Sequence, residues 1–582
     1  MQANKLAERV ESKLTPAPIA TVTERRDILI LIILLAAYAA CFLPICFQVG
    51  FYLDDWLTFW NLHFAPHNFF DLLKASFSDP RMVTRPVQCF YYASTYFFFG
   101  DRPLPYHLLR FSLEYVGAVF LYLGLKRLST SHFMAALSTL LFLLYPTHDA
   151  THYWIGAALG PGFGLTLYLA SFYFTLCAFE TRKTYQYALA VLLYGLSAFC
   201  YESFLPMLVL SFCGVLLLSS EYRTESRLNT FASTVRWFAP FIILGLLEPV
   251  YQRFMLPRLT HVFLSPTAVD PIYSLNVFVQ GLNVSLFAGL WSFLASRIRE
   301  CILSLTMLNV WQLTGTLAAT AALMAVSYSR NQRVQYKRLF VACGLTILAS
   351  YLTFALAQGY TPVLDTMINR VNIGASVAVS ILMAMTIKWL VERFHRSTPG
   401  YKLSCRPDRR AITISLMVLP LVAGMVLANL GMSAFWICSW NVQKNVRFLI
   451  SKSAENIKDG DAIILGDTHR YLMWAPVFDG TWDFQSMLRM TLNKNTVSGG
   501  VVSDRLCISG NKIRDISLGY VCASYDADKV KLLLPSESAW IPVNTSKQFI
   551  DLVAKKSSRD ISAATLKRWR QGAADQSLCS AK

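Results

Sequence analysis

The chain has 582 residues, of which 54% are hydrophobic and only 15% are charged. This composition excludes an ordinary soluble protein of this size and indicates a protein with several membrane-spanning segments. Lysine and arginine exceed aspartate and glutamate by 18. The basic residues form short clusters between apolar stretches, as the positive-inside rule expects, which argues against a nucleic-acid-binding surface.

Residues 1–26 are polar and are predicted to form a cytoplasmic leader. The apolar stretch that follows is long enough to remain in the membrane, so we expect a signal anchor rather than a cleaved signal peptide. Its N-terminus would then lie in the cytoplasm.

A helix needs about 20 apolar residues to cross a bilayer. This length predicts about eleven transmembrane helices, near residues 27–49, 105–125, 131–146, 154–178, 185–200, 203–220, 237–255, 303–327, 338–357, 371–391 and 411–438. The basic clusters all fall on one side of these helices, which is therefore predicted to be cytoplasmic. The predicted topology places Gly160, Gln358 and Lys582 outside and Arg182, Arg330 and Arg406 inside.

The apolar segment 275–296 ends beside Arg297 and Arg299. If it crossed the membrane, every later basic loop would lie on the wrong side. We therefore expect an interfacial or re-entrant helix on the outer face.

Three regions are predicted to face outward: the first loop at 50–104, the loop at 255–302, and the tail at 439–582. The tail alternates short apolar runs with polar turns, which is typical of a small α/β domain, and should begin with a helix near 440–457 followed by a strand. The expected fold is an α-helical polytopic membrane domain at 27–438 with a C-terminal extracytoplasmic α/β domain. Because the tail's scattered "GDTHR" and "FDGTWDF" residues form no clustered catalytic set, we expect the tail to cap the outer end of the helices and select what enters there rather than to perform chemistry.

Cys507 and Cys522 lie in the polar part of this tail. In an oxidising compartment they could form a disulfide, and the alternative is two separate thiols.

Adjacent carboxylates, Asp54 and Asp55, follow the first predicted span in the sequence "FYLDDWLTFW". Neighbours on a helix diverge by about 100°, so the two side chains cannot both address one atom. Either the pair marks the edge of the bilayer or one of the two is a catalytic base.

His148 and His152 stand four residues apart, so a helix would place both on one face, with Asp149 beside them. This spacing is used by metal sites, although a third ligand is not evident. Metal binding, contact with a phosphate or an acceptor, and plain interfacial histidines all remain open.

Several motifs occur in a fixed order along the first 210 residues. They are the aspartate pair, an Arg-Pro at 85–86, a Phe-Gly turn leading to Tyr-His-Leu at 106–108, the "YPTHDATHYW" loop, and the acidic residue of "FCYESFLP". In this order they resemble the GT-C superfamily of membrane glycosyltransferases, most closely the branch of protein O-mannosyltransferase-like and bacterial lipid-sugar-dependent enzymes. The rest of the chain resembles the superfamily in topology only.

The resemblance implies transfer of a single sugar from a polyprenyl-phosphate donor to a glycan, glycolipid or protein on the outer face of the membrane. A first-loop carboxylate would act as general base, with Asp54 favoured over Asp55 because it comes first after the span. Glu202 matches the acidic residue that opens a later span, where it would orient the acceptor or join Asp54 in a shared network. Its alternative is a carboxylate favoured by the dipole at a helix N-terminus.

Donor-phosphate contacts are expected from three arginines, Arg81, Arg85 and Arg370. Arg85 precedes a proline, which favours an extended backbone that would aim its side chain outward. Its alternative role is an interfacial anchor. Arg370 resembles the lipid-phosphate-binding arginine of the superfamily and follows Asp365 and Asn369, which share a helical face. A divalent cation, Mg or Mn, is left open because members of the superfamily differ in needing one.

The chain departs from the branch pattern at Arg110 and Glu114, where an Asn and a His are usual. Glu114 would lie inside the second span, so it must pair with another group or face a wet cavity. His107, in the Tyr-His-Leu motif, is expected to pack.

Two other functions remain as alternatives. A transporter or flippase would line a path with charges, but few charges lie at mid-bilayer depth and no inverted repeat is visible. A polymerase or ligase of lipid-linked glycans would share the topology. The tail and the lack of an ER retention signal favour a bacterial inner membrane with the tail in the periplasm.

Overall fold

The computed structural model describes residues 25–129, 131–222, 227–255, 270–289, 292–303, 306–328, 336–357, 360–364, 366–396, 409–517, 520–556 and 561–574. Most of the predicted leader lies outside these residues, as do Asp365, Arg330, Gln358, Arg406 and Lys582.

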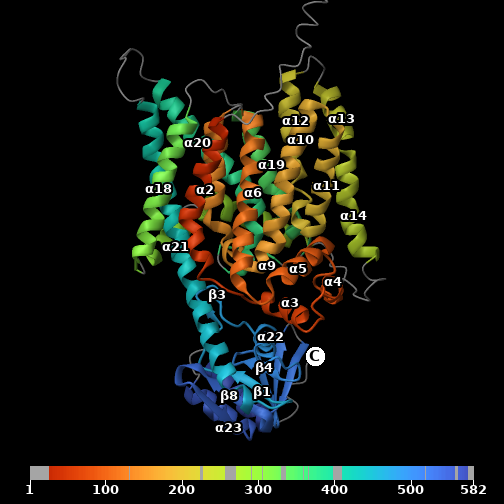
Figure 1. Ribbon diagram of the computed structural model, residues 1–582, viewed down its shortest axis with the longest axis vertical. Helices are drawn as coiled ribbons and strands as arrows, with labels where there is room; N and C mark the ends of the chain where they lie inside the picture. Colours follow the sequence, from red (N-terminus) through yellow and green to blue (C-terminus); the bar gives the residue numbers. More distant parts are fainter. Residues whose placement is uncertain are drawn as a thin grey trace, which may run out of the picture.

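A bundle of long apolar helices forms the membrane domain (Figure 1). Its helices are α2 (Arg25–Cys46), α6 (Pro103–Ser129), α7 (His132–Leu144), α10 (Phe163–Thr181), α11 (Thr184–Cys200), α12 (Leu208–Tyr222), α13 (Arg227–Trp237), α14 (Ala239–Val250), α18 (Met307–Ser327), α19 (Tyr336–Ala357), α20 (Ile373–Arg396) and α21 (Arg409–Lys452). In the described part of the chain eight helices are long and apolar enough to cross a membrane, and a pair bent at Trp237–Ala239 makes a ninth. The chain is an integral membrane protein.

Each of the eleven stretches predicted to span the membrane is mostly helical over its described residues. Two of them, α7 and α11, are shorter than a full span. α7 nevertheless lies inside the bundle, since all of its side chains are buried.

The segment predicted to lie on the outer face folds as α16 (Pro271–Leu282), a short π-helix (Asn283–Ala288) and α17 (Ser292–Leu303). The Ser274 hydroxyl donates to the Ala355 carbonyl on α19 at 2.8 Å. A Cβ on Gly431 of α21 would lie 2.6 Å from the Arg297 carbonyl oxygen, so α17 and α21 are in backbone contact. The segment is thus packed onto the bundle, and its depth in the membrane remains a prediction.

The first loop forms three helices, α3 (Asp54–His63), α4 (Phe69–Ser78) and α5 (Pro86–Phe99). They lie at the same end of the bundle as the C-terminal domain (Figure 1). The two regions therefore share one side of the membrane domain, as the sequence predicted for them.

The tail joins the bundle through α21, a single 44-residue helix. The predicted span 411–438 and the predicted helix near 440–457 are therefore one continuous element. The predicted domain boundary at 438/439 falls inside this helix, because nothing between the two predicted segments breaks its hydrogen bonding.

A four-stranded sheet of order β4-β1-β8-β9 forms the core of the tail. Its strands are β1 (Ala462–Leu465), β4 (Ser498–Val501), β8 (Val530–Leu534) and β9 (Ala539–Pro542), of which the first three are parallel. Ile463 and Leu465 pack on the side of α22 (Thr481–Leu492), whereas Ala462 and Ile464 pack on the side of α23 (Ser546–Lys556) and α24 (Ala563–Ala574). This alternation makes the tail the predicted α/β domain.

A second, antiparallel sheet contains β5 (Leu506–Ser509), β6 (Lys512–Ser517) and β7 (Tyr520–Asp526) in the order β5-β6-β7. Cys507 is on β5 and Cys522 on β7, so β6 separates them by two interstrand spacings, about 9.5 Å. A disulfide requires Cα atoms within about 7 Å. Neither of the two alternatives left open by the sequence holds. Cys522 carries an exposed thiol, which excludes the Cys507–Cys522 disulfide, and Cys507 is disulfide-bonded, which excludes two separate thiols.

Candidate active site

The aspartate pair opens α3, and the structure separates its two side chains. Asp55 is fully buried; its Oδ2 accepts from the Tyr52 backbone N–H at 2.9 Å and its Oδ1 from the Gly156 N–H at 2.7 Å. The Asp54 side chain is 54% exposed. The divergence predicted for helical neighbours is confirmed.

Burial gives Asp55 an anchoring role. It raises the pKa of the Asp55 carboxyl well above the usual value, because the charged form loses its hydration. The two backbone donors tie the start of α3 to the segment around Gly156. Asp54 is the member of the pair that an incoming molecule can reach.

Arg81 lies beside Asp54, with its Nη1 3.6 Å from Asp54 Oδ1. The same guanidinium is held by Asp79, whose Oδ2 accepts from Nη2 at 2.6 Å. Asp79 is almost completely buried, whereas 43% of the Arg81 side chain is exposed. The charge of Arg81 therefore faces the same open space as Asp54.

Arg85 and Glu202 form a two-point ion pair across the outer end of the bundle. Arg85 Nε donates to Glu202 Oε2 at 2.8 Å, and Nη2 donates to Oε1 at 2.6 Å. The guanidinium also lies over the Tyr201 ring, 4.5 Å from its centroid. Glu202 also opens the short 3₁₀-helix η3 (Glu202–Phe204), so its position at a helix N-terminus is confirmed. The ion pair that the structure adds is with Arg85, which the sequence did not predict.

Arg370 is on the short 3₁₀-helix η6 (Met367–Asn372), at the mouth between α19 and α20. Its guanidinium lies 5.0 Å from the Trp154 ring centroid and 5.4 Å from that of Tyr360. Trp154 precedes Gly156, the residue that binds Asp55, so the segment 154–156 connects Arg370 to the start of α3. This connection was not predicted. The first glycine of "YWIGAALG", Gly156, marks it in the sequence, because the close approach of Asp55 favours a residue without a side chain: a Cβ there would lie 3.1 Å from Asp55 Oδ1.

The two histidines lie together, but the expected trio with Asp149 divides. The rings of His148 and His152 are 5.0 Å apart, which confirms their shared face. Asp149, in contrast, accepts from Asn369 and, at 3.3 Å, from the Trp436 indole N–H. Asp149 is thus bound to η6 and α21, because the chain between the histidines turns from a 3₁₀-helix (Pro146–His148) into α8 (Ala150–Tyr153).

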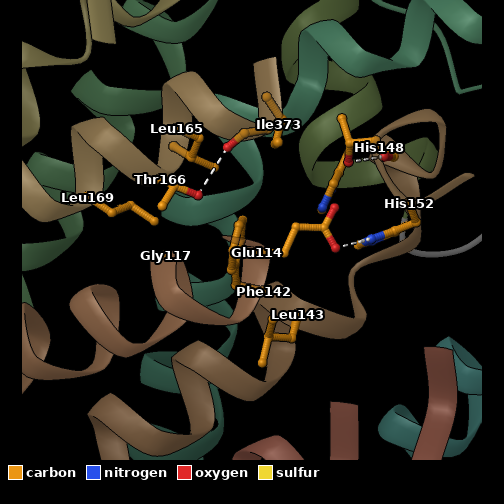
Figure 2. Close-up of a pocket in the computed structure, with 12 residues that line it drawn as sticks. Glu114, Gly117, Phe142, Leu143, His148, His152, Leu165, Thr166, Leu169 and Ile373 are labelled. Atoms are coloured by element: carbon orange, nitrogen blue, oxygen red, sulfur yellow. Dashed lines mark hydrogen bonds and ion pairs between the residues drawn. The ribbon is translucent and has the colours of Figure 1, made fainter. Parts of the chain in front are cut away.

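His152 and His148 belong to a small cavity inside the bundle (Figure 2). Glu114 points toward both histidines, and its Oε2 lies 3.2 Å from His152 Nδ1 and 3.3 Å from Arg110 Nη1. Tyr38 donates a further hydrogen bond to Glu114. We predicted that Glu114 must pair with another group or face a wet cavity. It pairs with Arg110, the other departure from the branch pattern, and it also lines the cavity.

Metal ligation can be tested on these same groups. Among the described residues, no three His, Cys, Asp or Glu side chains gather closely enough to hold a metal ion. His148 Nδ1 is 3.0 Å from the Ser376 hydroxyl, and His107 Nε2 is 3.0 Å from the Gly50 carbonyl oxygen. Within the ranges that the structure describes, the two histidines therefore gain no third ligand, and His107 packs as expected.

The tail covers part of the first loop next to this site. The Trp60 indole on α3 donates to Asn495 at 3.1 Å, and Arg489 of α22 lies over the Trp60 ring. The Trp56 indole donates to Gln443 on α21 at 2.8 Å. The tail and α21 therefore both contact α3, the helix that begins with Asp54.

No family model matches the chain, and no curated protein matches it. Among solved structures, the chain is similar to ArnT from Cupriavidus metallidurans bound to undecaprenyl phosphate, with 11% identity and a TM-score of 0.35 over 81% of this chain and 85% of that one. It is also similar to the archaeal oligosaccharyltransferase AglB from Archaeoglobus fulgidus in complex with an inhibitory peptide and a dolichol-phosphate. That match has 10% identity and a TM-score of 0.36 and covers 81% of this chain and 64% of AglB. Both TM-scores are below 0.5, so neither match decides the function, which has to be argued from the residues of the site.

Proposed function

We propose that the chain is a membrane glycosyltransferase of the GT-C type, which moves one sugar from a polyprenyl-phosphate donor to an acceptor on the outer face of the membrane. The observation that supports it best is the placement of Asp54. It is a half-exposed carboxylate at the start of α3, next to Arg81, at the end of the bundle where Arg85 and Arg370 also lie.

The reaction needs a base and a cationic site for the leaving group. The acceptor hydroxyl attacks the anomeric carbon of the donor sugar and gives its proton to Asp54. The bond between that carbon and the phosphate oxygen breaks, and its electrons pass to the lipid phosphate. A positioned carboxylate contributes about 10²–10⁴-fold to such a step.

The departing phosphate already carries negative charge, so it needs positive charge more than a proton. Arg81 and Arg370 both present partly exposed guanidinium groups to the outer surface. Arg85 is held by Glu202 and would contribute by fixing the loop before α5. The divalent cation that the resemblance leaves open, Mg or Mn, is given no step in this proposal.

The compartment and acceptor follow from the predicted topology. With the basic loops in the cytoplasm, the first loop and tail face the periplasm of a bacterial inner membrane. The acceptor would be a glycan, glycolipid or protein that reaches the first loop from water.

The test compares Asp54→Asn with Asp55→Asn, each purified and assayed for transfer of radiolabelled sugar from a polyprenyl-phosphate donor. Asp54→Asn should lower transfer by roughly 10²–10⁴-fold without loss of stability, since it removes only the proton acceptor. Asp55→Asn should mainly lower stability, because it weakens a buried anchor. Normal transfer by a stable Asp54→Asn variant would refute the assignment of the base, and no transfer by the unaltered protein would favour a transporter.

A further inference from the structure

Two arginines from separate loops meet at one carboxylate in the tail. Arg470 follows β1 and Arg505 follows β4, and both donate to Asp479. Arg470 Nε binds the Asp479 carbonyl oxygen at 2.9 Å, while Arg505 Nη1 reaches the carboxylate at 3.2 Å. A second carboxylate, Asp483, accepts from the Asp479 backbone N–H at 2.7 Å. Both carboxylates are buried, whereas 23% of the Arg470 side chain and 31% of the Arg505 side chain are exposed, so the guanidinium groups form the accessible part of the cluster.

This cluster lies at the edge of the sheet where ligands are expected. β1, β4 and β8 are parallel, so their carboxyl ends share one edge. From β1 the chain passes through α22 to β4 on one side, and the next parallel strand, β8, lies on the other side of β1. In open α/β sheets ligands bind in the crevice outside the carboxyl ends, where the strand order reverses in this way.

The side chains at this edge suit a sugar that carries a carboxylate or phosphate group. The Arg505 guanidinium lies 5.2 Å from the centroid of the Trp482 ring, and 31% of the Arg505 side chain is exposed. Arginine presents a planar fork that matches a carboxylate or phosphate, and tryptophan offers a large apolar face. The hydrogen bonds from Arg505 to Asp479 are longer than those from Arg470. Arg505 is therefore the arginine that can more easily turn to a ligand.

The loop that carries this cluster also contacts the membrane domain. Between Arg470 and Asp479 the chain forms the β2–β3 hairpin (Tyr471–Leu472 and Ala475–Pro476). Trp474 in the hairpin lies under the Arg297 guanidinium and 5.6 Å from the Phe435 ring of α21. Figure 1 shows β3 between the sheet and the helix bundle. A ligand at this edge would thus lie beside the outer face of the bundle.

We propose that the carboxyl edge of the tail sheet binds an acidic sugar, with Arg505 on its carboxylate or phosphate, Trp482 against a sugar ring, and Arg470 held by Asp479 beside them. That this sugar belongs to the acceptor rests on the proposed function. The anion site itself does not depend on sugar transfer.

The experiment measures binding by calorimetry to the full chain in detergent micelles. The probes are trigalacturonic acid, glucose 6-phosphate and, as the neutral control, maltotriose. Arg505→Gln should weaken binding of an acidic probe by about tenfold or more, because it removes a charge-assisted contact. Trp482→Phe should weaken it less. Lys512→Gln removes a 56% exposed cation on β6 and should change nothing.

Each outcome decides the matter. Binding of trigalacturonic acid or glucose 6-phosphate, with maltotriose unbound, supports the site and shows whether it takes a carboxylate or a phosphate. Equal binding of maltotriose, no binding of either acidic probe, or equal losses in Arg505→Gln and Lys512→Gln would overturn it. Thermal unfolding of each variant separates lost binding from lost folding, and Trp482→Phe tests the site if Arg505→Gln unfolds.

The Asp54→Asn variant separates this proposal from the proposed function. It should bind the acidic probe like the unaltered chain while losing transfer. If it retained both, only the assignment of the base would fail. If probe binding were absent while Asp54→Asn still abolished transfer, only the acidic-sugar site would fail.

Discussion

Two clusters of charge, one inside the bundle and one at the end of the bundle nearest the tail, both combine a carboxylate with an arginine but differ in their exposure to water. The inner cluster of Glu114, Arg110 and His152 is buried, and its charges are paired with one another. In the outer cluster, Asp54 and Arg81 are about half exposed and 3.6 Å apart. A charge in the membrane domain has to be matched internally, whereas the outer charges remain available to a substrate.

The largest effect is expected when the inner cluster loses one partner. Glu114→Gln would leave the buried Arg110 without its carboxylate, which costs about 3–5 kcal/mol. The yield of folded protein and its melting temperature in detergent should therefore fall sharply. The matched control is Glu180→Gln, which removes the carboxylate of a partly exposed pair with Arg127 and should have little effect. Equal stability of the two variants would mean that the inner cluster does not support the fold.

A smaller effect is expected when the outer ion pair is broken. Glu202→Gln leaves Arg85 with a weaker partner, but both side chains are about one quarter exposed and water can replace part of the lost interaction. Transfer should fall about tenfold, with a change in melting temperature much smaller than for Glu114→Gln. A double-mutant cycle with Arg85→Gln measures the coupling. Additive effects would show that the two residues act independently.

The link between the segment 154–156 and α3 can be tested by a single methyl group. In Gly156→Ala the new Cβ would lie 3.1 Å from Asp55 Oδ1 and 3.0 Å from the Trp154 ring, so both must shift. We expect a loss of about 1 kcal/mol in stability and a several-fold loss of transfer. Gly162→Ala is the control, because the nearest atom to its new Cβ, the Ala157 carbonyl oxygen, would be 3.7 Å away. Identical behaviour of both variants would exclude a role for the Gly156 contact.

The smallest effect is the pH dependence of stability that arises from His63 at the C-terminal end of α3. His63 Nδ1 is 2.9 Å from Asp101 Oδ2, and this hydrogen bond raises the pKa of His63 above 6.5. The protonated histidine thus stabilises the fold below pH 6.5, and the contribution disappears as pH rises through the higher folded-state pKa. The melting temperature should decline slightly over this window. In His63→Gln the decline should be smaller, and an unchanged slope would contradict the assignment.

Sequence length and hydropathy predicted the helices of the membrane domain well, because crossing a bilayer imposes about 20 apolar residues on each. They could not show that α21 continues into the tail, since amphipathic and apolar halves of one helix have different patterns. The divergence of Asp54 and Asp55 was predictable from helix geometry alone. Which of the two would be buried depended on the Gly156 N–H, about a hundred residues away in the chain.

Contacts between distant loops set the limits of prediction in the tail. "GDTHR" and "FDGTWDF" looked unrelated, yet Arg470 and Asp479 meet at the base of a hairpin too short to show a strand pattern. The Cys507–Cys522 disulfide failed for a similar reason, since the intervening strand β6 was not resolved from sequence. Pairing across a sheet depends on strand order, which local residue patterns do not encode.

The continuous α21 has a mechanical consequence. At 1.5 Å per residue its 44 residues extend about 66 Å. A bilayer core takes up only about 30 Å of that length, so a stiff rod projects beyond the membrane and carries the sheet at its far end. The distance between the sheet and the lipid headgroups is then a fixed spacing. If the proposed function is right, this spacing sets how long an acceptor must be to touch the sheet while its hydroxyl lies at Asp54.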